Sequence, residues 1–205
     1  MPKPHAPSCD RNRDPILAVI QPELAQARCV LELGSGTGQH AVHFAAAMPH
    51  LHWQTTERTP EQLDGIRLWL ADAALPNTPP PLVLDVAAPQ WPAAAQQADA
   101  VFTANTLHYM PWPAVQALFA HLPQALAPGA CLIAYGPFRI DGQHTSASNV
   151  QFDQWLAGVD PRFAVRDLGE VDALARAIGL QCVARHPMPA NNFTVVWRLS
   201  PLHQA

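Results

Sequence analysis

The sequence contains few cysteines, and they form no motif. Its four cysteines include no Cys-x-x-Cys pair, and the last three lie inside apolar runs, where a free thiol behaves as a small core hydrophobe. They are Cys9, Cys29, Cys131 and Cys182. We therefore expect neither disulfides nor a zinc site. The histidine pairs His40/His43 and His50/His52 also lack a carboxylate or third ligand at a useful spacing, so no metal centre is predicted.

Charge is scarce as well. Charged residues make up 14% of the 205 residues, and 12 Lys and Arg stand against 16 Asp and Glu, for a net charge of −4. No lysine or arginine cluster supplies the electrostatic attraction that nucleic-acid binding needs. We therefore do not expect DNA or RNA as a partner.

Long hydrophobic runs are missing too. Uncharged stretches such as 131–138 fall far short of the roughly 20 residues that a membrane span requires. The N-terminal stretch MPKPHAPSCDRNRDP has no apolar core of the kind that a secretory signal contains. We expect a cytoplasmic protein with no transmembrane segment.

The chain is long enough for one folded domain. Hydrophobic residues make up 49% of it, which is typical of a folded soluble protein. A chain of this length buries roughly 70% of the surface that its unfolded form exposes. We therefore interpret residues 1–205 as a single domain, in which 1–27 form an N-terminal segment and helix.

Strand and helix patterns alternate along the sequence. Short apolar runs predict strands at 29–33, 52–56, 81–85, 99–104, 131–135, 180–185 and 193–199. Periodicity and end signals predict helices at 15–27, 39–48, 60–73, 112–126 and 167–178. Pro123 is expected to kink or divide the fourth helix, and Asp14 followed by Pro15 is typical of a helix start. Such alternation favours a doubly wound α/β fold, with a parallel sheet covered by helices on both faces.

Residues 30–40, VLELGSGTGQH, place a glycine-rich turn directly behind a predicted strand. The turn is typical of nucleotide binding, but Gly34, Gly36 and Gly38 are spaced Gly-x-Gly-x-Gly, whereas the dinucleotide fingerprint is Gly-x-Gly-x-x-Gly. Glu32 would repel a pyrophosphate by about 4 kcal/mol at roughly 4 Å and an effective dielectric of 20. The same carboxylate would attract the ammonium and sulfonium of S-adenosylmethionine. Both observations favour S-adenosylmethionine over NAD.

Acids also end the next two predicted strands, where ligands bind in doubly wound folds. Glu57 follows Gly38 by 19 residues, the place from which an acid accepts hydrogen bonds from ribose hydroxyls. Asp85 in PLVLDV is positioned to accept the adenine amino group, with Val86 offering its backbone amide. An acid at a strand end also commonly caps the following helix, and that alternative stays open for each of these positions.

Several motifs resemble those of known enzymes. VLELGSGTGQH, DAVFTANTLHYMPW and YGPF are similar to class I S-adenosylmethionine-dependent methyltransferases. More narrowly, RNRDPIL, SGTGQHAVHFA, SNVQFD, FAVRDLGEV and MPANNFTVVWRL resemble the methyltransferase-like 26 family over about residues 10–199. The resemblance implies a Rossmann-like seven-stranded sheet, mostly parallel with an antiparallel last strand. One departure is Glu57 in QTTERTPEQ, where the resemblance leads us to expect an aspartate.

The N-terminal Arg11, Asn12 and Arg13 are not explained by helix capping. Our hypothesis is that Arg11 or Asn12 folds over the cofactor and binds its carboxylate, because Glu32 accounts only for the positive end. The predicted cofactor-binding residues are therefore Arg11, Asn12, Glu32, Gly34, Ser35, Gly36, Thr37, Gly38, His40, Glu57, Asp85, Val86 and Asn105.

Methyl transfer from a sulfonium is an in-line displacement, so alignment and water exclusion dominate. A hydroxyl, thiol or ammonium acceptor also needs a base. Candidates are His108 and Tyr109 in ANTLHYMPW, and His144 in DGQHTSASN. Alternatively, His108 is a helix-start histidine packed against the adenine or a neighbouring loop, and His144 is a solvated loop residue.

The segment 136–166 is longer than a structural connection needs. We expect it to cover the substrate pocket, with Trp155 and Leu156 on a short helix and with Asn149, Asp153 and the turn 189–192 offering polar contacts. Phe152 and Trp155 are otherwise simply the core of that helix.

Together these observations predict an S-adenosylmethionine-dependent methyltransferase that acts on a small molecule. An NAD(P)-dependent oxidoreductase would share the sheet and the acid at position 57. A non-catalytic S-adenosylmethionine-binding module would share the whole cofactor site. The sequence leaves the methyl acceptor and the oligomeric state open.

Overall fold

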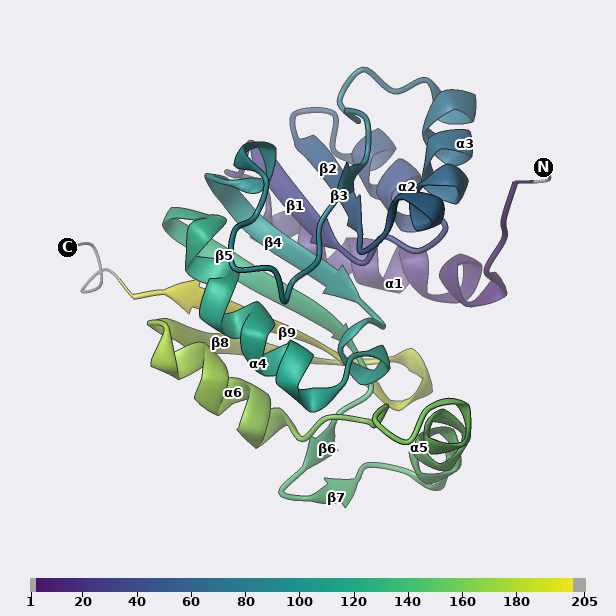
Figure 1. The fold of residues 1–205 in the computed structure, drawn as a ribbon, viewed down its shortest axis with the longest axis vertical. Coiled ribbons are helices and arrows are strands. Elements are labelled where there is room, and N and C mark those ends of the chain that lie inside the picture. Colours follow the sequence, from purple (N-terminus) through teal and green to yellow (C-terminus); the bar gives the residue numbers. More distant parts are fainter. Residues whose placement is uncertain (1–2, 201–205) are drawn as a thin grey trace.

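A seven-stranded sheet forms the centre of the structure, which is a computed structural model describing residues 3–200 (Figure 1). Its strands are β1 (Cys29–Leu33), β2 (His52–Glu57), β3 (Leu82–Val83), β4 (Ala98–Ala104), β5 (Leu126–Gly136), β8 (Leu180–Met188) and β9 (Asn192–Leu199). They lie in the order β3-β2-β1-β4-β5-β9-β8. Strands β1 to β5 are parallel, and β9 is antiparallel to both of its neighbours. The strand order reverses between β1 and β4, so the ligand crevice is expected at the carboxyl ends of these two strands.

Helices cover both faces of the sheet. They are α1 (Pro7–Glu23), α2 (Gln39–Ala47), α3 (Leu63–Ala73), α4 (Trp112–His121), α5 (Ala147–Val159) and α6 (Leu168–Ala177). One core cluster joins α1 and α2 to the sheet through Ile16, Phe44 and Phe102, and the opposite cluster joins α4 and α6 to it. The arrangement confirms the predicted doubly wound α/β fold and the antiparallel last strand.

The segment between β5 and α6 leaves the layers of the sheet. It forms a short hairpin, β6 (Arg139–Ile140) and β7 (Gln143–His144), and then α5. Figure 1 shows α5 beyond the carboxyl ends of β4 and β5, on the side where a ligand crevice is expected. No helix between residues 3 and 200 combines the length and apolarity needed to cross a membrane.

The first helix begins earlier than the sequence predicts. It starts at Pro7 with Ala6 as its N-cap, so the predicted start at Asp14 and Pro15 is wrong. Asp14 instead lies inside the helix and pairs through Oδ1 with Nε2 of His43, 2.9 Å away on α2. Tertiary contacts of this kind, which no local end signal reports, extend the helix through an internal proline that would otherwise weaken it.

Other boundaries also differ, and the first helix ends at Glu23 instead of at residue 27. Only Leu82 and Val83 of the predicted strand 81–85 pair with β2, because β3 is an edge strand that follows Pro79, Pro80 and Pro81, which have no amide to donate. The predicted helix 112–126 is divided near Pro123 into α4 and the 3-10 turn η4 (Leu122–Gln124), as anticipated. Strand β5 then begins at Leu126 instead of after the proline and glycine at 128–129.

Candidate functional site

The glycine turn lies between β1 and α2. Gly34, Gly36 and Gly38 have φ values of +69°, +58° and +91°, which L side chains rarely adopt. A Cβ added at Gly34 would lie 2.6 Å from Cγ2 of Thr106, so the turn approaches the segment after β4 closely. No atom lies within 4 Å of a Cβ built on Gly36, so the turn faces open space at that residue.

Ser35 fixes the turn to the neighbouring strand. Its amide donates to the carbonyl of Thr56 at 2.9 Å, and its Oγ accepts from the amide of Thr56 at 3.1 Å. Thr37 begins the entry to α2, where its Oγ1 donates to Oε1 of Gln39 at 3.0 Å. Gly38, which has no side chain, is the N-cap residue of α2.

Glu57 ends β2 directly beside this turn. Its Oε1 accepts from the amide of Gly36 at 2.8 Å, and its Oε2 accepts from the amide of Arg58 at 3.2 Å. These two backbone bonds orient the carboxylate, and each of its oxygens can accept a further hydrogen bond. The acid that the sequence places at the end of the second strand therefore meets the glycine turn.

Glu32 lies behind the turn and is only 2% exposed. Its Oε2 accepts a hydrogen bond from Nε1 of Trp53 at 3.1 Å. Burial raises the pKa of Glu32 to about 7, although the bonds from Trp53 and Ser35 oppose that rise. Glu32 therefore carries the full negative charge that the sequence predicts only when the pH exceeds this pKa of about 7. The carboxylate that bonds directly to the turn is that of Glu57.

Asp85 and Val86 follow the short strand β3. Asp85 is exposed, and its Oδ1 accepts from the amide of Ala87 at 2.9 Å. This bond is a local turn contact and not a helix cap, because the next helical turn, η2 (Ala93–Ala95), begins eight residues after Asp85. Val86 is buried, and its carbonyl accepts from Nδ1 of His121 at 3.1 Å. Both residues stand at the strand end that the sequence predicts.

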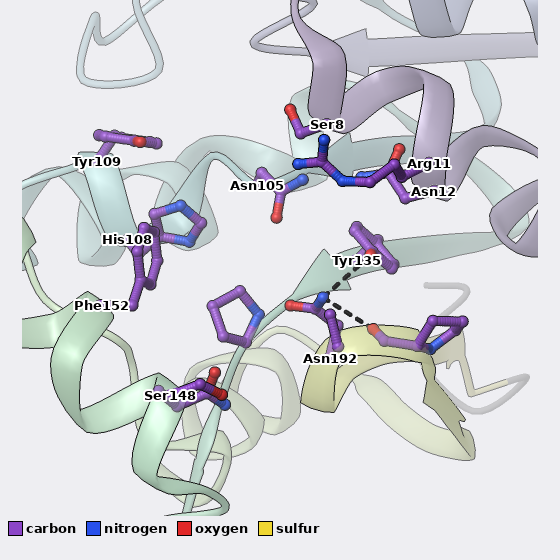
Figure 2. A pocket seen from close by; sticks show the side chains of 14 residues that line it. Ser8, Arg11, Asn12, Asn105, His108, Tyr109, Tyr135, Ser148, Phe152 and Asn192 are labelled. Atoms are coloured by element: carbon purple, nitrogen blue, oxygen red, sulfur yellow. Dashed lines mark hydrogen bonds between the residues drawn. The ribbon is translucent and has the colours of Figure 1, made fainter.

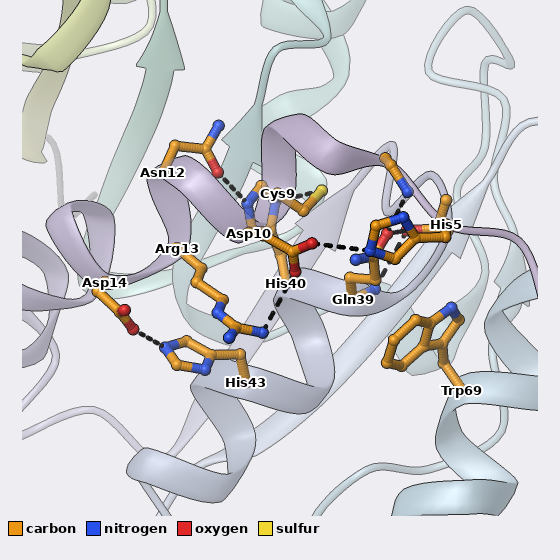
Figure 3. A network of polar contacts seen from close by, with 12 residues as sticks. His5, Cys9, Asp10, Asn12, Arg13, Asp14, Gln39, His40, His43 and Trp69 are labelled. Atoms are coloured by element: carbon orange, nitrogen blue, oxygen red, sulfur yellow. Dashed lines mark hydrogen bonds and ion pairs between the residues drawn. The ribbon is translucent and has the colours of Figure 1, made fainter.

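A polar network joins the first helix to the helix after the glycine turn (Figure 3). Nε2 of His40 lies 2.7 Å from Oδ1 of Asn12, and Nδ1 of His40 lies 4.0 Å from Sγ of Cys9. Nearer the start of α1, the amide of Ala6 donates to Oε1 of Gln39 at 2.6 Å. Burial lowers the pKa of His40 to about 4, so its ring is neutral near pH 7. His40 thus supports Asn12 from behind.

A cavity of about 560 Å³ opens between α1, the ends of β4 and β5, helix α5 and the turn before β9 (Figure 2), and residues 34–38 of the glycine turn are not among the described residues that line it. Its polar and aromatic lining includes Arg11, Asn12, Asn105, His108, Tyr109, Tyr135, Asn149, Phe152 and Asn192. Asn105 has a φ of +54° and receives its position from the bond between its amide and the carbonyl of Tyr135, 2.8 Å long. The structure therefore gathers Arg11, Asn12, Asn105 and His108 around one space.

His108 faces this cavity from the 3-10 turn η3 (Leu107–Tyr109), and it is 3% exposed. Its ring meets Phe152 of α5 edge to face at 5.1 Å. Burial and, secondly, the Arg166 guanidinium lower the pKa of His108 to about 3. The neutral ring can accept a hydrogen bond but binds a proton weakly. Tyr109 is 42% exposed, and burial of the rest of its ring raises its pKa.

His144 lies elsewhere. It belongs to β7 and pairs through Nε2 with Oδ2 of Asp153 on α5 at 3.2 Å. It is not among the residues of 3–200 that line the cavity. Trp155 is 54% exposed and stacks on Phe152 at 5.8 Å, while Phe152 itself reaches the cavity. Trp155, which was predicted to cover the pocket, therefore lies about one helical turn from Phe152, which lines it.

Sequence reasoning assigned no role to two residues of the cavity. Tyr135 ends β5, and its hydroxyl accepts from Nδ2 of Asn192 at 3.1 Å. Its position at a predicted strand end was the available signal. Ser8 lines the cavity from α1, and it was missed because the helix was expected to start seven residues later. No three His, Cys, Asp or Glu side chains gather as a metal site in the described part of the chain.

The fold is that of methyltransferases of known structure. The S-adenosylmethionine-dependent methyltransferase SibL superposes with a TM-score of 0.77 at 21% identity, over 93% of this chain and 55% of SibL. The mitomycin 7-O-methyltransferase MmcR gives 0.74 at 22% identity, over 86% and 50%. Human N-acetylserotonin methyltransferase, solved in complex with SAM, gives 0.78 at 14% identity, over 94% and 53%. The chain spans about half the length of these structures.

The match to a sequence family is more specific. Residues 3–199 match the family described as "Protein of unknown function (DUF938)". The chain therefore belongs to the DUF938 family and has the fold of class I S-adenosylmethionine-dependent methyltransferases.

Proposed function

We propose that this protein is a class I S-adenosylmethionine-dependent methyltransferase that methylates a small molecule. The observation that carries the proposal is the junction between the glycine turn and the cavity. Thr106 lies against Gly34, and the adjoining Asn105 lines the cavity. A nucleotide seated on the turn therefore has one end beside a space whose volume, about 560 Å³, falls in the range of small-molecule sites.

The residues around the turn fit the chemical groups of the donor. Glu57 is oriented by two backbone amides and retains acceptor capacity for ribose hydroxyls. Asp85 and Val86 stand at the next strand end, where the adenine is expected. Arg11 lines the cavity and pairs with no carboxylate within residues 3–200, so its guanidinium is available for the donor carboxylate. Asn12 lies beside it.

Glu32 complements the positive end of the donor. Its carboxyl is nearly half protonated at neutral pH, because burial raises its pKa to about 7. A nearby cation favours the ionised form of a carboxyl. Glu32 would therefore release its proton as the donor binds, and its charge would appear only when a sulfonium or ammonium is present to offset it. A pyrophosphate would favour the protonated form instead.

The donor supplies an activated methyl group on sulfur, and the chain must align the acceptor and exclude water. The neutral ring of His108 faces the cavity and would accept a hydrogen bond from the acceptor. Tyr109 lines the same wall. His144 has a different role in this proposal, because its pairing with Asp153 ties the hairpin to α5.

The segment 136–166 closes one side of the acceptor site in this proposal. Pro137, Ser148, Asn149 and Phe152 of that segment line the cavity. Asn149 is held by two bonds from its Nδ2, to Oγ1 of Thr145 and to the carbonyl of Asn191, both at 3.0 Å. On this basis residues 1–205 function as a single methyltransferase domain. The quoted motifs also lead us to infer kinship with the methyltransferase-like 26 family.

Calorimetric titration tests the cofactor assignment. S-adenosylhomocysteine should bind with micromolar affinity, which corresponds to about −8 kcal/mol, and NADH should not bind. Binding of NADH without binding of the sulfur nucleotide would identify an oxidoreductase and overturn the proposal.

A second experiment addresses the acceptor. The protein is incubated with methyl-labelled S-adenosylmethionine and a cell extract separated into metabolite, protein and nucleic-acid fractions. We expect label in the metabolite fraction only. Binding of the donor with no labelled product in any fraction would identify a non-catalytic binding module, and label in a macromolecular fraction would refute the small-molecule assignment.

A further inference from the structure

Arg166 braces the turn that carries His108. It lies in the connection between α5 and α6 and is 8% exposed. Its Nε donates to the carbonyl of Leu107 at 3.2 Å, and its Nη2 donates to the carbonyl of Met110. Leu107 and Met110 stand at the two ends of the η3 turn. One guanidinium therefore bridges both ends of a turn that comes from a different part of the chain.

The backbone around Arg166 is itself held firmly. The amide of Val165 donates to Oδ1 of Asp153 on α5 at 2.6 Å, and the carbonyl of Arg166 accepts from the amide of Arg139 at 2.9 Å. The Trp112 ring lies 5.7 Å from the guanidinium carbon. The Arg166 side chain thus reaches the η3 turn from a fixed base and cannot easily follow a displaced turn.

The same connection also bonds to His108 directly. The amide of Ala164 donates to the carbonyl of His108 at 3.1 Å. The imidazole leaves this backbone toward the cavity, where Phe152 of α5 bounds it edge to face. Position and orientation of the ring therefore depend on the connection 160–166 together with α5.

We propose that Arg166 is a positioning residue that holds the η3 turn so that the imidazole of His108 faces the cavity. The benefit to catalysis rests on the proposed function, because an acceptor hydroxyl or thiol can donate a hydrogen bond to an uncharged ring. The coupling between the Arg166 guanidinium and the His108 ring can be measured without any reaction.

Two effects act in the same direction on the ring. Burial disfavours the charged imidazolium, and the Arg166 cation adds a repulsion. Other charged or titratable groups around the ring and its brace are Tyr109 on η3, Arg11 on α1, Tyr135 on β5, Arg139 on β6, Asp153 on α5 and Glu170 on α6. The two acids among them act on Arg166. Arg166 is the cation that acts on the ring.

Nuclear magnetic resonance titration of the histidine rings tests this coupling without any substrate. The His108 signal is identified by its loss in His108→Gln. In the wild-type protein we expect this signal to titrate only below about pH 5, with a midpoint near pH 3. In Arg166→Gln we expect its midpoint to rise by about one pH unit or more, because one like charge is lost. Arg166→Lys retains the charge and should shift the midpoint less than Arg166→Gln.

Arg162→Gln is the matched control. Arg162 belongs to the same connection but is exposed and pairs with Asp160 at 2.7 Å, so its loss should leave the His108 titration unchanged. An unchanged His108 midpoint in folded Arg166→Gln would overturn the proposal. If that variant does not fold, the wild-type titration decides, since a His108 midpoint near the ordinary value of 6.5 would overturn it equally.

A functional readout separates this inference from the proposed function. In Arg166→Gln we expect unchanged affinity for S-adenosylhomocysteine, a lower kcat and an acid limb of the kcat profile moved to higher pH. A merely structural Arg166 would lower the melting temperature without moving that limb. Failure of the wild-type protein to bind S-adenosylhomocysteine would refute the methyltransferase assignment, while the His108 titration would still decide the coupling.

Discussion

Nε2 of His40 and Oδ1 of Asn12 lie 2.7 Å apart and join the helix after the glycine turn to the first helix. Cys9 lies against the other ring nitrogen. Both contacts are satisfied when the Cys9 thiol donates to Nδ1 of His40 and the protonated Nε2 donates to Oδ1 of Asn12. In this arrangement the Asn12 carbonyl is engaged by His40, and the Asn12 side chain also bonds to Tyr135 at the wall of the cavity that both residues line. The relationship makes His40 a support for Asn12, which we propose as a contact to the cofactor.

Replacing His40 by leucine should therefore weaken both the fold and the cofactor site. The buried Asn12 carbonyl would lose its partner, at a cost of about 1–3 kcal/mol in the free energy of unfolding. Affinity for S-adenosylhomocysteine should fall about tenfold, or about 1.4 kcal/mol. Urea unfolding and calorimetry measure the two effects. His43→Leu, which removes the pairing with Asp14 and an edge contact with Phe44, serves as the control, and an unchanged affinity in His40→Leu would contradict the support role.

The buried Glu32 should make the stability depend on pH. Its pKa rises from an ordinary value of 4.5 to about 7, so between these values the folded protein holds more protons than the unfolded chain. The contribution of Glu32 to the free energy of unfolding therefore falls as pH rises through this window, whereas His40 and His108, whose pKa values are lowered to about 4 and about 3, add a contribution that rises with pH up to about 6.5. Glu32→Gln removes only the falling contribution, and it should gain up to about 3 kcal/mol relative to wild type between about pH 5 and pH 8. Urea unfolding at several pH values measures the difference.

The exposed Glu170 provides the comparison for that experiment. Glu170→Gln should keep the wild-type slope of stability against pH across the same window. A Glu32→Gln variant with that same slope would show that Glu32 ionises normally in the folded protein.

Glu57 should contribute to cofactor affinity through its oriented carboxylate. Glu57→Gln keeps the size of the side chain but loses the charge that strengthens hydrogen bonds from ribose hydroxyls, at about 1.5–3 kcal/mol for a bond to a charged group. S-adenosylhomocysteine should bind about 10–100-fold more weakly. The exposed Asp64, which pairs with Arg67 on α3, offers Asp64→Asn as a control with unchanged affinity. Equal affinity of Glu57→Gln and wild type would remove Glu57 from the cofactor site.

Two glycines of the turn should respond differently to alanine. Both Gly34 and Gly36 have positive φ, but only Gly34 would place its Cβ against Thr106. Gly36→Ala should cost about 1–2 kcal/mol from backbone strain, whereas Gly34→Ala adds a clash of about 1–3 kcal/mol. Thr106→Ser removes the methyl group at 2.6 Å and should recover part of the Gly34→Ala loss. Thermal unfolding of the single and double variants measures the coupling, and strict additivity would exclude it.

Local patterns predicted most of the fold, because they report burial directly. The apolar run at β1 and the periodicity of α6 occur in the structure within two residues of the expected bounds. The start of α1 was not predictable in this way. Asp14 and Pro15 carry a strong local start signal, but contacts of Asn12 and Gln39 across to the neighbouring helix continue α1 back to Pro7.

The candidate site was also predictable only in part. Strand ends are readable from sequence, so Glu57 and Asn105 could be assigned to the ligand edge before any contact was known. Residues that reach the site from α5 could not, since the rotation of a helix decides whether Phe152 or Trp155 faces inward. His144 is the opposite case. Its place in a polar segment predicted a catalytic role, but in the structure its side chain pairs with Asp153.

By itself the sequence determined the doubly wound fold, the glycine turn and the acids that follow it, because hydrophobic period and glycine spacing are local properties. Only the tertiary structure decided the ionisation of Glu32 and His108. Those states depend on burial and on charges such as Arg166 that come from distant parts of the chain. Desolvation is a property of the packed interior, so no spacing of residues along the chain reports it.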